Sequence, residues 1–307
     1  MFPTFIIPGA QKAGTTSLYF YLKEHPEVVV SSKKEPYFFC GPINNKKIVN
    51  YKKLFVKKNG AKVAGESSTV YMCSKKAAAR IKKLLGNNIK FIFMLRNPTD
   101  RTISAYYHMA KRQADKRSIA EALHLVGTTK EIVKQEETNL KTTLKEKGIV
   151  LEKAQYVSDE PLQHFHYIRN SFYSRFIKDY LKLFPKKNFL FILTEDLKSK
   201  PKETIKKIEN FLEIDNTFIP KGLGVMHNVT YVPDKSIKSK LFNATIEFAT
   251  KYLNINSKIL KKLYEKYTES TKPKTQNKTK QILDNIFEKE IKELGQLINL
   301  DLKKVWI

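Results

Sequence analysis

Residues 8–22 read PGAQKAGTTSLYFYL, and this stretch decides the fold. It follows the apolar run at residues 5–7, which is short enough to be a buried strand. The chain then turns on Gly9 and Gly14 and continues with apolar residues at helical spacing. A strand, a small-residue turn and a helix start form a cradle for an anion, because backbone N–H groups converge at the positive helix N-terminus and Lys12 adds a full charge. We therefore expect a phosphate or sulfate group to bind here.

The nucleoside-triphosphate P-loop, G-x-x-x-x-G-K-[ST], has the same glycine spacing as Gly9 and Gly14. The two motifs differ at Thr15, which stands where the P-loop has its lysine, and Lys12 lies inside the turn instead. No hydrophobic strand ends in a clear metal-binding aspartate. The stretch therefore predicts a phosphate loop that works without a metal, and a glycine turn with no ligand is the alternative.

The segment QKAGTTSL, residues 11–18, resembles the 5′-phosphosulfate loop of sulfotransferases that use 3′-phosphoadenosine 5′-phosphosulfate (PAPS). The resemblance implies that the loop binds the 5′-phosphosulfate of this donor and that 3′,5′-adenosine bisphosphate (PAP) is the product. The implied donor-binding residues of the loop are Lys12, Ala13, Gly14, Thr15, Thr16 and Ser17. Lys12 is also implied as a catalytic residue, since it would neutralise charge on the departing phosphate.

A second motif follows the strand-like run at residues 91–95. Residues 96–108 read RNPTDRTISAYYH and resemble the 3′-phosphate site of the family, R-N-P-x-x-R-x-x-S-x-Y. The resemblance implies that Arg96 and Ser104 bind the 3′-phosphate, since an arginine fork fits a phosphate bidentately and a hydroxyl adds a neutral donor. A surface arginine that caps a loop is the alternative, and Arg101 could brace the same loop.

Residues 31–39 read SSKKEPYFF and contain the carboxylate that we predict as the general base. A glutamate set before a proline and an aromatic cluster is partly desolvated, which raises its basicity. The segment resembles K-E-x-x-F-F of the heparan-sulfate-type sulfotransferases, which implies that Glu35 takes the proton from the acceptor hydroxyl. Glu35 could instead only pair with a neighbouring lysine, and Glu66 and His108 are the alternative bases.

Three further segments bear on the resemblance. Tyr173 in SFYSRF resembles the tyrosine that contacts adenine in relatives, and an ordinary core tyrosine is the alternative. Residues 300–306, LDLKKVW, resemble the motif D-L-x-x-W, in which the tryptophan packs. The basic-glycine loop that covers the 3′-phosphate in relatives has no clear counterpart near residues 221–238. Donors and charge could come there from His227, Asn228, Lys235 or Lys238.

The order of strand-like and helical patterns predicts an α/β fold. Apolar runs at residues 5–7, 61–64, 91–95 and 189–193 are separated by helical patterns, as in a parallel sheet covered on both faces. We expect a P-loop-like central parallel sheet of about four to five strands in a single domain, residues 1–307. A helical insertion at about 111–168 is expected to form the acceptor site or a lid. An apolar stripe over residues 282–297 predicts a C-terminal core helix.

The composition indicates an anionic partner. The 307 residues include 57 Lys and Arg against 30 Asp and Glu, which gives a net charge of +27. Nucleic acid, a membrane surface and a polyanionic substrate with its cofactor all fit such a charge. With two cysteines, no signal peptide and no apolar run long enough to span a bilayer, we expect a cytoplasmic protein without disulfide bonds.

Together these observations predict a PAPS-dependent sulfotransferase that moves a sulfuryl group to an acceptor hydroxyl, with an amine less favoured. The expected acceptor is a carbohydrate or glycolipid, with peripheral contact to an anionic membrane surface. Neither a metal nor a nucleic acid is expected to bind. An ATP-dependent, P-loop kinase-like enzyme and a non-enzymatic, basic nucleic-acid-binding protein are the alternatives.

Overall fold

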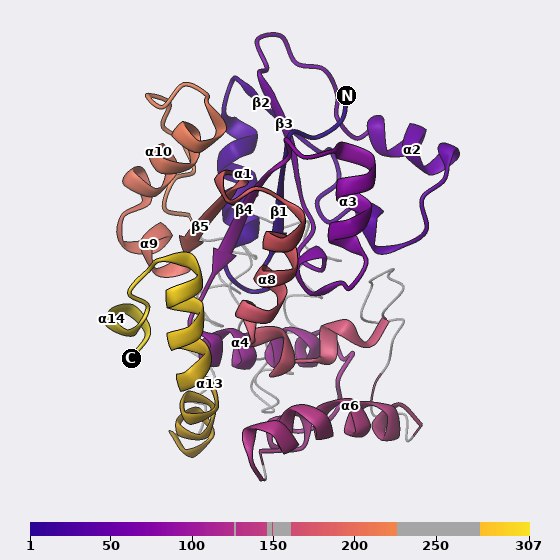
Figure 1. Ribbon diagram of the computed structural model, residues 1–307, viewed down its shortest axis with the longest axis vertical. Helices are drawn as coiled ribbons and strands as arrows, with labels where there is room; N and C mark the ends of the chain where they lie inside the picture. The colour runs from indigo at the N-terminus through magenta and orange to yellow at the C-terminus, as the bar shows by residue number, and fades with distance from the viewer. Residues whose placement is uncertain (126, 146–148, 150–160, 226–276) are drawn as a thin grey trace, which may run out of the picture.

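A five-stranded parallel sheet forms the centre of the fold (Figure 1). The structure is a computed structural model, and it describes residues 1–125, 127–145, 149, 161–225 and 277–307. The strands lie in the order β2-β3-β1-β4-β5, and every neighbouring pair is parallel. Their bounds are β1 (Phe5–Gly9), β2 (Val28–Val30), β3 (Val63–Ser67), β4 (Lys90–Leu95) and β5 (Phe189–Leu193). The predicted α/β fold with a central parallel sheet is confirmed.

Helices flank this sheet and connect its strands (Figure 1). They are α1 (Thr15–Glu24), α2 (Asn45–Lys52), α3 (Ala77–Leu85), α4 (Pro98–Lys111), α5 (Ile119–Leu123), α6 (Thr129–Lys145), α8 (Tyr173–Leu183), α9 (Thr194–Ser199), α10 (Pro201–Leu212), α13 (Asn277–Ile298) and α14 (Lys303–Trp306). Helix α1 packs against β2 and β3, α10 packs against α9 and β5, and α8 contacts both α3 and α13. The C-terminal helix α13 also contacts α4, the helix that follows β4.

Aromatic side chains pack β4 against the edge strand β5 and against α8. The ring of Phe91 stacks on that of Phe189, its register partner in β5, with ring centroids 5.4 Å apart. The ring of Phe93 lies edge-on to Tyr180 of α8, with centroids 5.3 Å apart. Burial of one such side chain stabilises the fold by about 2 kcal/mol. Strand and helix therefore share one aromatic core.

Strand β3 differs from the sequence prediction in its position. The apolar pattern predicts a strand at residues 61–64, whereas β3 runs from Val63 to Ser67 and includes Glu66. A buried carboxylate is tolerated in this strand because three hydroxyl groups hydrogen-bond it. Gly65 is required beside β1, since a Cβ atom there would lie 2.1 Å from Cζ of Phe5. Strand β2 was missed because a three-residue edge strand is too short to show a pattern.

The described part of residues 111–168 contains α5, α6 and a 3-10 turn at Pro161–Phe165. Glu136 on α6 ties this segment to the chain that follows it. Its carboxylate accepts hydrogen bonds from the backbone N–H groups of Ile168, at 2.8 Å, and Arg169, at 3.0 Å. The role of the segment as acceptor site or lid stays a prediction. The predicted C-terminal core helix is confirmed as α13, which buries Leu283, Ile286, Phe287, Ile291 and Leu294.

The strand order reverses between β1 and β4. Within the sheet, β3 and β2 lie on one side of β1, whereas β4 and β5 lie on its other side. In open α/β sheets, ligands bind outside the carboxyl ends of the strands at such a reversal. The predicted phosphate loop follows β1 and Arg96 follows β4, so the fold brings the two predicted anion-binding elements to this position.

Candidate active site

The predicted phosphate loop joins β1 to α1. Gly14 is the N-cap of α1 and has a φ of 88°, a left-handed conformation that favours glycine. Thr194, which follows β5, holds the loop, because its hydroxyl oxygen lies 2.8 Å from the carbonyl oxygen of Ala13. The side chains of this turn are buried or half-buried, namely those of Ala13, Thr15, Thr16 and Ser17. What the loop offers to a ligand is the set of backbone N–H groups in the first turn of α1.

Lys12 lies among other cations at this turn. Its side chain is half-buried. Burial and, after it, four nearby positive charges lower the pKa of Lys12 from 10.5 to about 7. These charges belong to Arg96, Lys111, Arg112 and Lys34. Because like charges repel one another unless an anion lies between them, the cluster fits a multiply charged anionic ligand.

Arg96 connects the second predicted anion site directly to the first. Its Nη1 donates a hydrogen bond to the carbonyl oxygen of Lys12, at 3.3 Å. Its Nη2 lies 3.7 Å from Oδ2 of Asp100 in the first turn of α4. The guanidinium group is therefore held between the loop after β1 and the helix after β4. The structure therefore brings the two motifs into direct contact.

Helix α4 places Ser104 on the face that runs along this site. Asp100, Ser104 and His108 are each four residues apart, so they lie on one side of the helix. Asp100 contacts Arg96 at one end of this stripe, and the charge of Lys12 acts on His108 at the other. Ser104 is half-buried and lies between them. This position fits its predicted role at the 3′-phosphate.

Tyr173 fixes the backbone of Arg96 by a hydrogen bond. The side chain is fully buried at the start of α8, and its hydroxyl donates to the carbonyl oxygen of Arg96, at 3.0 Å. Burial raises the pKa of Tyr173, so the hydroxyl keeps its proton and remains a donor. The predicted contact of Tyr173 with adenine stays a prediction. A backbone contact with Arg96 has no sequence signal, and sequence reasoning missed it.

Glu35 is held by its neighbour Lys34 and by the chain at the end of β3. Its backbone N–H donates to the carbonyl oxygen of Ser67 at the end of β3, at 3.0 Å. Its Oε2 accepts from the backbone N–H of Thr69, at 2.8 Å, and its Oε1 accepts from Nζ of Lys34, at 2.6 Å. The lysine pair that the sequence left open is therefore present. Because Ser67 ends β3, which runs parallel to β1, Glu35 lies at the same carboxyl edge of the sheet as the phosphate loop.

Glu66 is buried behind the Glu35 segment, with 1% of its surface exposed. It accepts hydrogen bonds from the hydroxyls of Tyr51, at 2.5 Å, Ser68, at 2.6 Å, and Tyr71, at 3.0 Å. Burial raises the pKa of Glu66 to about 7. Ser68 Oγ in turn accepts from the backbone N–H of Tyr37, at 3.2 Å. Glu66 thus positions the segment that holds Glu35, and its burial keeps it from an acceptor.

His108 is the other alternative base. Burial and, after it, the charges of Lys12 and Arg112 lower the pKa of His108 to about 2. An imidazole with so low a pKa is a weak proton acceptor. His108 is therefore disfavoured as the base in the free site, and the choice of Glu35 stays a prediction.

The phosphate loop also contacts the segment 111–168. Gln11 Nε2 lies 3.2 Å from Nδ1 of His164, beside a cavity of about 10 Å³ that Thr69 and Arg101 also line. Such a volume holds about one water molecule. Arg101 is buried and donates through Nε to Oγ of Ser171, at 2.7 Å, so it braces the chain behind the site. Gln11 and His164 are site residues that sequence reasoning did not identify.

A family model described as "Sulfotransferase domain" matches residues 2–295. This chain belongs to the sulfotransferase family. The predicted family is thus confirmed by an independent comparison that covers nearly the whole chain.

Curated relatives of this sulfotransferase match at low identity. "Membrane-associated sulfotransferase kil1" of Dictyostelium discoideum is 27% identical over 299 residues, which cover 78% of this chain and 62% of the relative. "Heparan sulfate glucosamine 3-O-sulfotransferase 5" of Mus musculus is 25% identical over 213 residues, which cover 69% of this chain and 54% of the relative. The chain spans less than two thirds of the length of these relatives.

A solved structure supports the fold of this sulfotransferase. The "Crystal Structure of Sulfotransferase from Alicyclobacillus acidocaldarius" matches with a TM-score of 0.62 and 22% identity, and the match covers 100% of this chain and 99% of that chain. At this identity the likeness concerns the fold.

The segment that should match the basic-glycine loop is described only in part. Tyr21 on α1 donates to the carbonyl oxygen of Val225, at 2.8 Å, and Glu24 accepts from the N–H of Lys221, at 2.5 Å. Residues 221–225 of this sulfotransferase therefore lie along α1. The candidate donors His227, Asn228, Lys235 and Lys238 lie outside the described residues.

Two absences hold for the described part of this sulfotransferase. It contains no group of three or more His, Cys, Asp and Glu side chains that could hold a metal ion. Within the same residues, no helix combines the length and the apolar character that crossing a bilayer requires.

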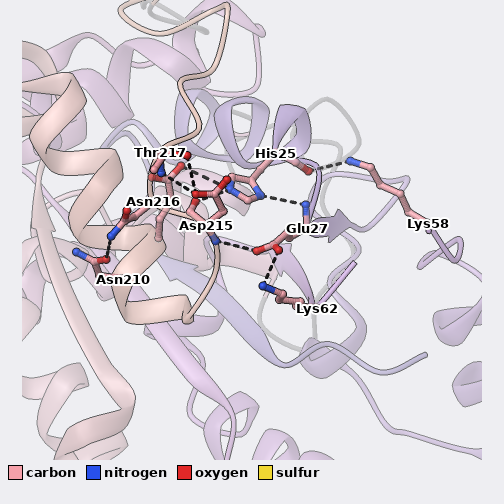
Figure 2. A network of polar contacts seen from close by, with 9 residues as sticks. His25, Glu27, Lys58, Lys62, Asn210, Asp215, Asn216 and Thr217 are labelled. Carbon is pink, nitrogen blue, oxygen red and sulfur yellow. Dashed lines mark hydrogen bonds and ion pairs between the residues drawn. The ribbon is translucent and has the colours of Figure 1, made fainter. Parts of the chain in front are cut away.

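The C-terminal end of α1 carries a second polar network, remote from the phosphate loop (Figure 2). His25 Nε2 lies 2.8 Å from the carbonyl oxygen of Asp215, and its Nδ1 accepts from the backbone N–H of Glu27, at 3.1 Å. Glu27 binds Lys62 Nζ, at 2.6 Å, and the backbone N–H of Asp215, at 2.7 Å. This network joins α1 to β3 and to the chain after α10.

Proposed function

We propose that this chain transfers a sulfuryl group from PAPS to a hydroxyl group of a carbohydrate or glycolipid acceptor. The observation that supports this most directly is the hydrogen bond from Arg96 Nη1 to the carbonyl oxygen of Lys12. This bond joins the N-terminal end of α1 to the guanidinium group of Arg96, at the carboxyl ends of the adjacent strands β1 and β4. One nucleotide with phosphates at both ribose positions fits such a pair.

The residues present fit the donor. The 5′-phosphosulfate would lie against Lys12 and the backbone N–H groups of Gly14, Thr15 and Thr16, with Ala13 and Ser17 completing the turn. Arg96 and Ser104 would bind the 3′-phosphate, and Tyr173 would support Arg96. The depressed pKa of Lys12 supports this assignment, because a dianionic phosphate would relieve the repulsion among the cations.

Each chemical role falls to a side chain of this site. The donor supplies an electrophilic sulfur with a phosphate leaving group. Glu35 takes the proton of the acceptor hydroxyl as the acceptor oxygen forms its bond to sulfur. Lys12 and the loop N–H groups receive the negative charge that develops on the bridging oxygen as its bond to sulfur breaks. Positioning and electrostatic stabilisation account for the catalysis, as in phosphoryl transfer.

The acceptor class rests on charge and on the relatives. A net charge of +27 favours an anionic or strongly hydrated acceptor over an apolar one. Relatives with names that specify heparan sulfate sulfotransferases support a carbohydrate. We propose that the acceptor lies next to Glu35, with the described residues around His164 as its outer wall, since His164 contacts Gln11 of the phosphate loop.

Two other functions compete with this proposal. A kinase-like enzyme would need ATP and a metal, yet Thr15 stands where the P-loop has the lysine that contacts the phosphates of ATP. A nucleic-acid-binding protein would show a steep salt dependence of affinity and no preference for PAP.

The proposal is tested by transfer of labelled sulfate from PAPS to a panel of glycans and glycolipids in the presence of a metal chelator. We expect product with at least one acceptor, and a loss of at least about a hundredfold in Glu35→Gln with PAP affinity unchanged. Glu213→Gln is the matched control, because Glu213 is also paired with a lysine, Lys90 at 2.8 Å, but is remote in the fold. Equal rates for Glu35→Gln and wild type would remove Glu35 as the base. Transfer of labelled phosphate from ATP, with none from PAPS, would overturn the proposal.

A further inference from the structure

A buried carboxylate on the C-terminal helix caps the helix that supports the donor site. Glu290 on α13 is 4% exposed, and both of its oxygens bind Ser174. Oε1 accepts from the backbone N–H of Ser174, at 2.8 Å, and Oε2 accepts from its hydroxyl, at 2.7 Å. Ser174 is the second residue of α8, where the backbone N–H has no partner within the helix. Burial raises the pKa of Glu290 to about 7, and its ionised form also interacts favourably with the positive end of the helix dipole.

The first turn of α8 leads directly to the donor site. Tyr173 precedes Ser174 and donates its hydroxyl to the carbonyl oxygen of Arg96, at 3.0 Å. Arg96 in turn donates to the carbonyl oxygen of Lys12, at 3.3 Å. A continuous path of hydrogen bonds and one peptide link therefore runs from Glu290 to the phosphate loop. Each of its members is buried or half-buried.

The C-terminal segment also contacts the loop of Arg96 directly, through Trp306. Asn97, the residue after Arg96, donates through Nδ2 to the carbonyl oxygen of Trp306, at 2.9 Å. Its Oδ1 accepts from the backbone N–H of Asp100 and so caps α4, at 3.1 Å. Trp306 belongs to the motif D-L-x-x-W, which donor chemistry and acceptor chemistry leave without a role. Figure 1 shows α14 next to α13.

We propose that Glu290 is a positioning residue for the 3′-phosphate site, and that the C-terminal segment 277–307 holds the Arg96 loop in its donor-binding conformation. The inference rests on the proposed function, because it assumes that Arg96 binds the 3′-phosphate of the donor. Loss of the Glu290 carboxylate frees the first turn of α8. Tyr173 then no longer fixes the carbonyl group of Arg96, and the guanidinium group loses its orientation.

The test uses the full chain and two probes, PAP and adenosine 5′-monophosphate, which lacks the 3′-phosphate. Their dissociation constants are measured by titration calorimetry for wild type, Glu290→Ala, Glu290→Gln and Ser174→Ala. We expect Glu290→Ala to weaken PAP by about three- to tenfold and adenosine 5′-monophosphate by much less, so that discrimination between the two falls. Glu290→Gln should restore most of the discrimination, since its amide oxygen can accept from the N–H of Ser174 and its amide group can donate to the hydroxyl.

Glu209→Ala is the matched control. Glu209 is a buried carboxylate of similar exposure, 1%, on α10, and it lies 3.8 Å from Nε2 of His25 at the end of α1 opposite the phosphate loop. Its loss should lower stability and leave discrimination unchanged. If Glu290→Ala proves too unstable to measure, the milder Ser174→Ala decides the matter in the same way. Unchanged discrimination in the Glu290 and Ser174 variants, or an equal loss in Glu209→Ala, would overturn the inference. Equal affinity of wild type for both probes would overturn the proposed donor site as well.

Discussion

At the N-terminal end of α1, the charges that act on Lys12 are all positive, whereas at its C-terminal end acids and bases alternate around His25. The first cluster lowers the pKa of Lys12 to about 7. In the second, Glu27 lies between Lys62 and the backbone N–H of Asp215. Both clusters lie at the ends of the same helix. In the first, Lys34 pairs with Glu35 and Arg96 lies near Asp100, yet the charges that act most strongly on Lys12 are positive.

This difference separates stability from function. In the second network Glu27 pairs with Lys62, and its hydrogen bonds hold the end of α1, the chain before β3 and the chain after α10 together. A cluster of like charges lowers the stability of the fold, and its presence is explained by a ligand of opposite charge. The comparison therefore supports the proposal of an anionic ligand at the N-terminal end of α1 and a structural role for the other end.

The largest effect is expected from the removal of one charge at the N-terminal end. Lys12→Ala should lower the rate of sulfuryl transfer by on the order of a hundredfold or more, because the charge on the leaving phosphate loses its nearest cation. Single-turnover rates measure this effect. Lys23→Ala removes the same charge from the exposed last turn of α1 and should leave the rate within about twofold of wild type, as exposed surface charges contribute little. Similar transfer rates for Lys12→Ala and Lys23→Ala would contradict a special role of the N-terminal end of α1.

A smaller effect is expected from pH. The free site holds Lys12 with a pKa of about 7, and a bound phosphate would raise this pKa toward its ordinary value. Binding of PAP above pH 7 therefore takes up a proton, and its affinity should fall by up to about tenfold per pH unit as the pH rises from 7 to 9.

Calorimetry in buffers with different heats of ionisation measures this proton uptake. Lys12→Met should bind PAP more weakly and with little pH dependence over the same range. An affinity of wild type that stays constant or rises with pH would contradict the charge repulsion that we assign to the site.

The smallest effect is expected at the other end of α1. Burial raises the pKa of Glu209 to about 7, so between its unfolded value of 4.5 and 7 the folded state binds more protons than the unfolded state. The free energy of unfolding from this group therefore decreases as pH rises through this range. Glu209→Gln should remove this decrease and raise the melting temperature at pH 8 by about 2 °C relative to wild type, with PAP affinity unchanged. A change in PAP affinity would contradict the purely structural role of this end.

The sequence was sufficient for the features that have local patterns. The glycines and Lys12 between a strand and a helix predict the phosphate loop, and Arg96 after an apolar run predicts the second anion site. The structure brings both together, since β1 and β4 are neighbours in the sheet. The apolar stripe of the C-terminal helix was equally visible.

Features that depend on distant residues could not be predicted. Thr69 binds Glu35 from 34 residues away, and Glu290 binds Ser174 from 116 residues away, so neither pair has a local pattern. Glu290 even interrupts the apolar stripe of α13, where a charged residue reads as a surface position. Burial decides the roles of Glu66 and Tyr173, and burial follows from packing and not from spacing.

The central claim is that Lys12 with its loop and Arg96 with Ser104 form one site for an adenosine with phosphates at both ribose positions. Titration calorimetry of PAP and adenosine 5′-monophosphate with wild type and Arg96→Ala tests it most directly. We predict that wild type binds PAP at least about tenfold more tightly, since a charged hydrogen-bonding contact to the 3′-phosphate contributes about 1.5 kcal/mol or more, and that Arg96→Ala loses most of this preference. Equal affinity of wild type for the two nucleotides, or a preference that survives in Arg96→Ala, would contradict the account.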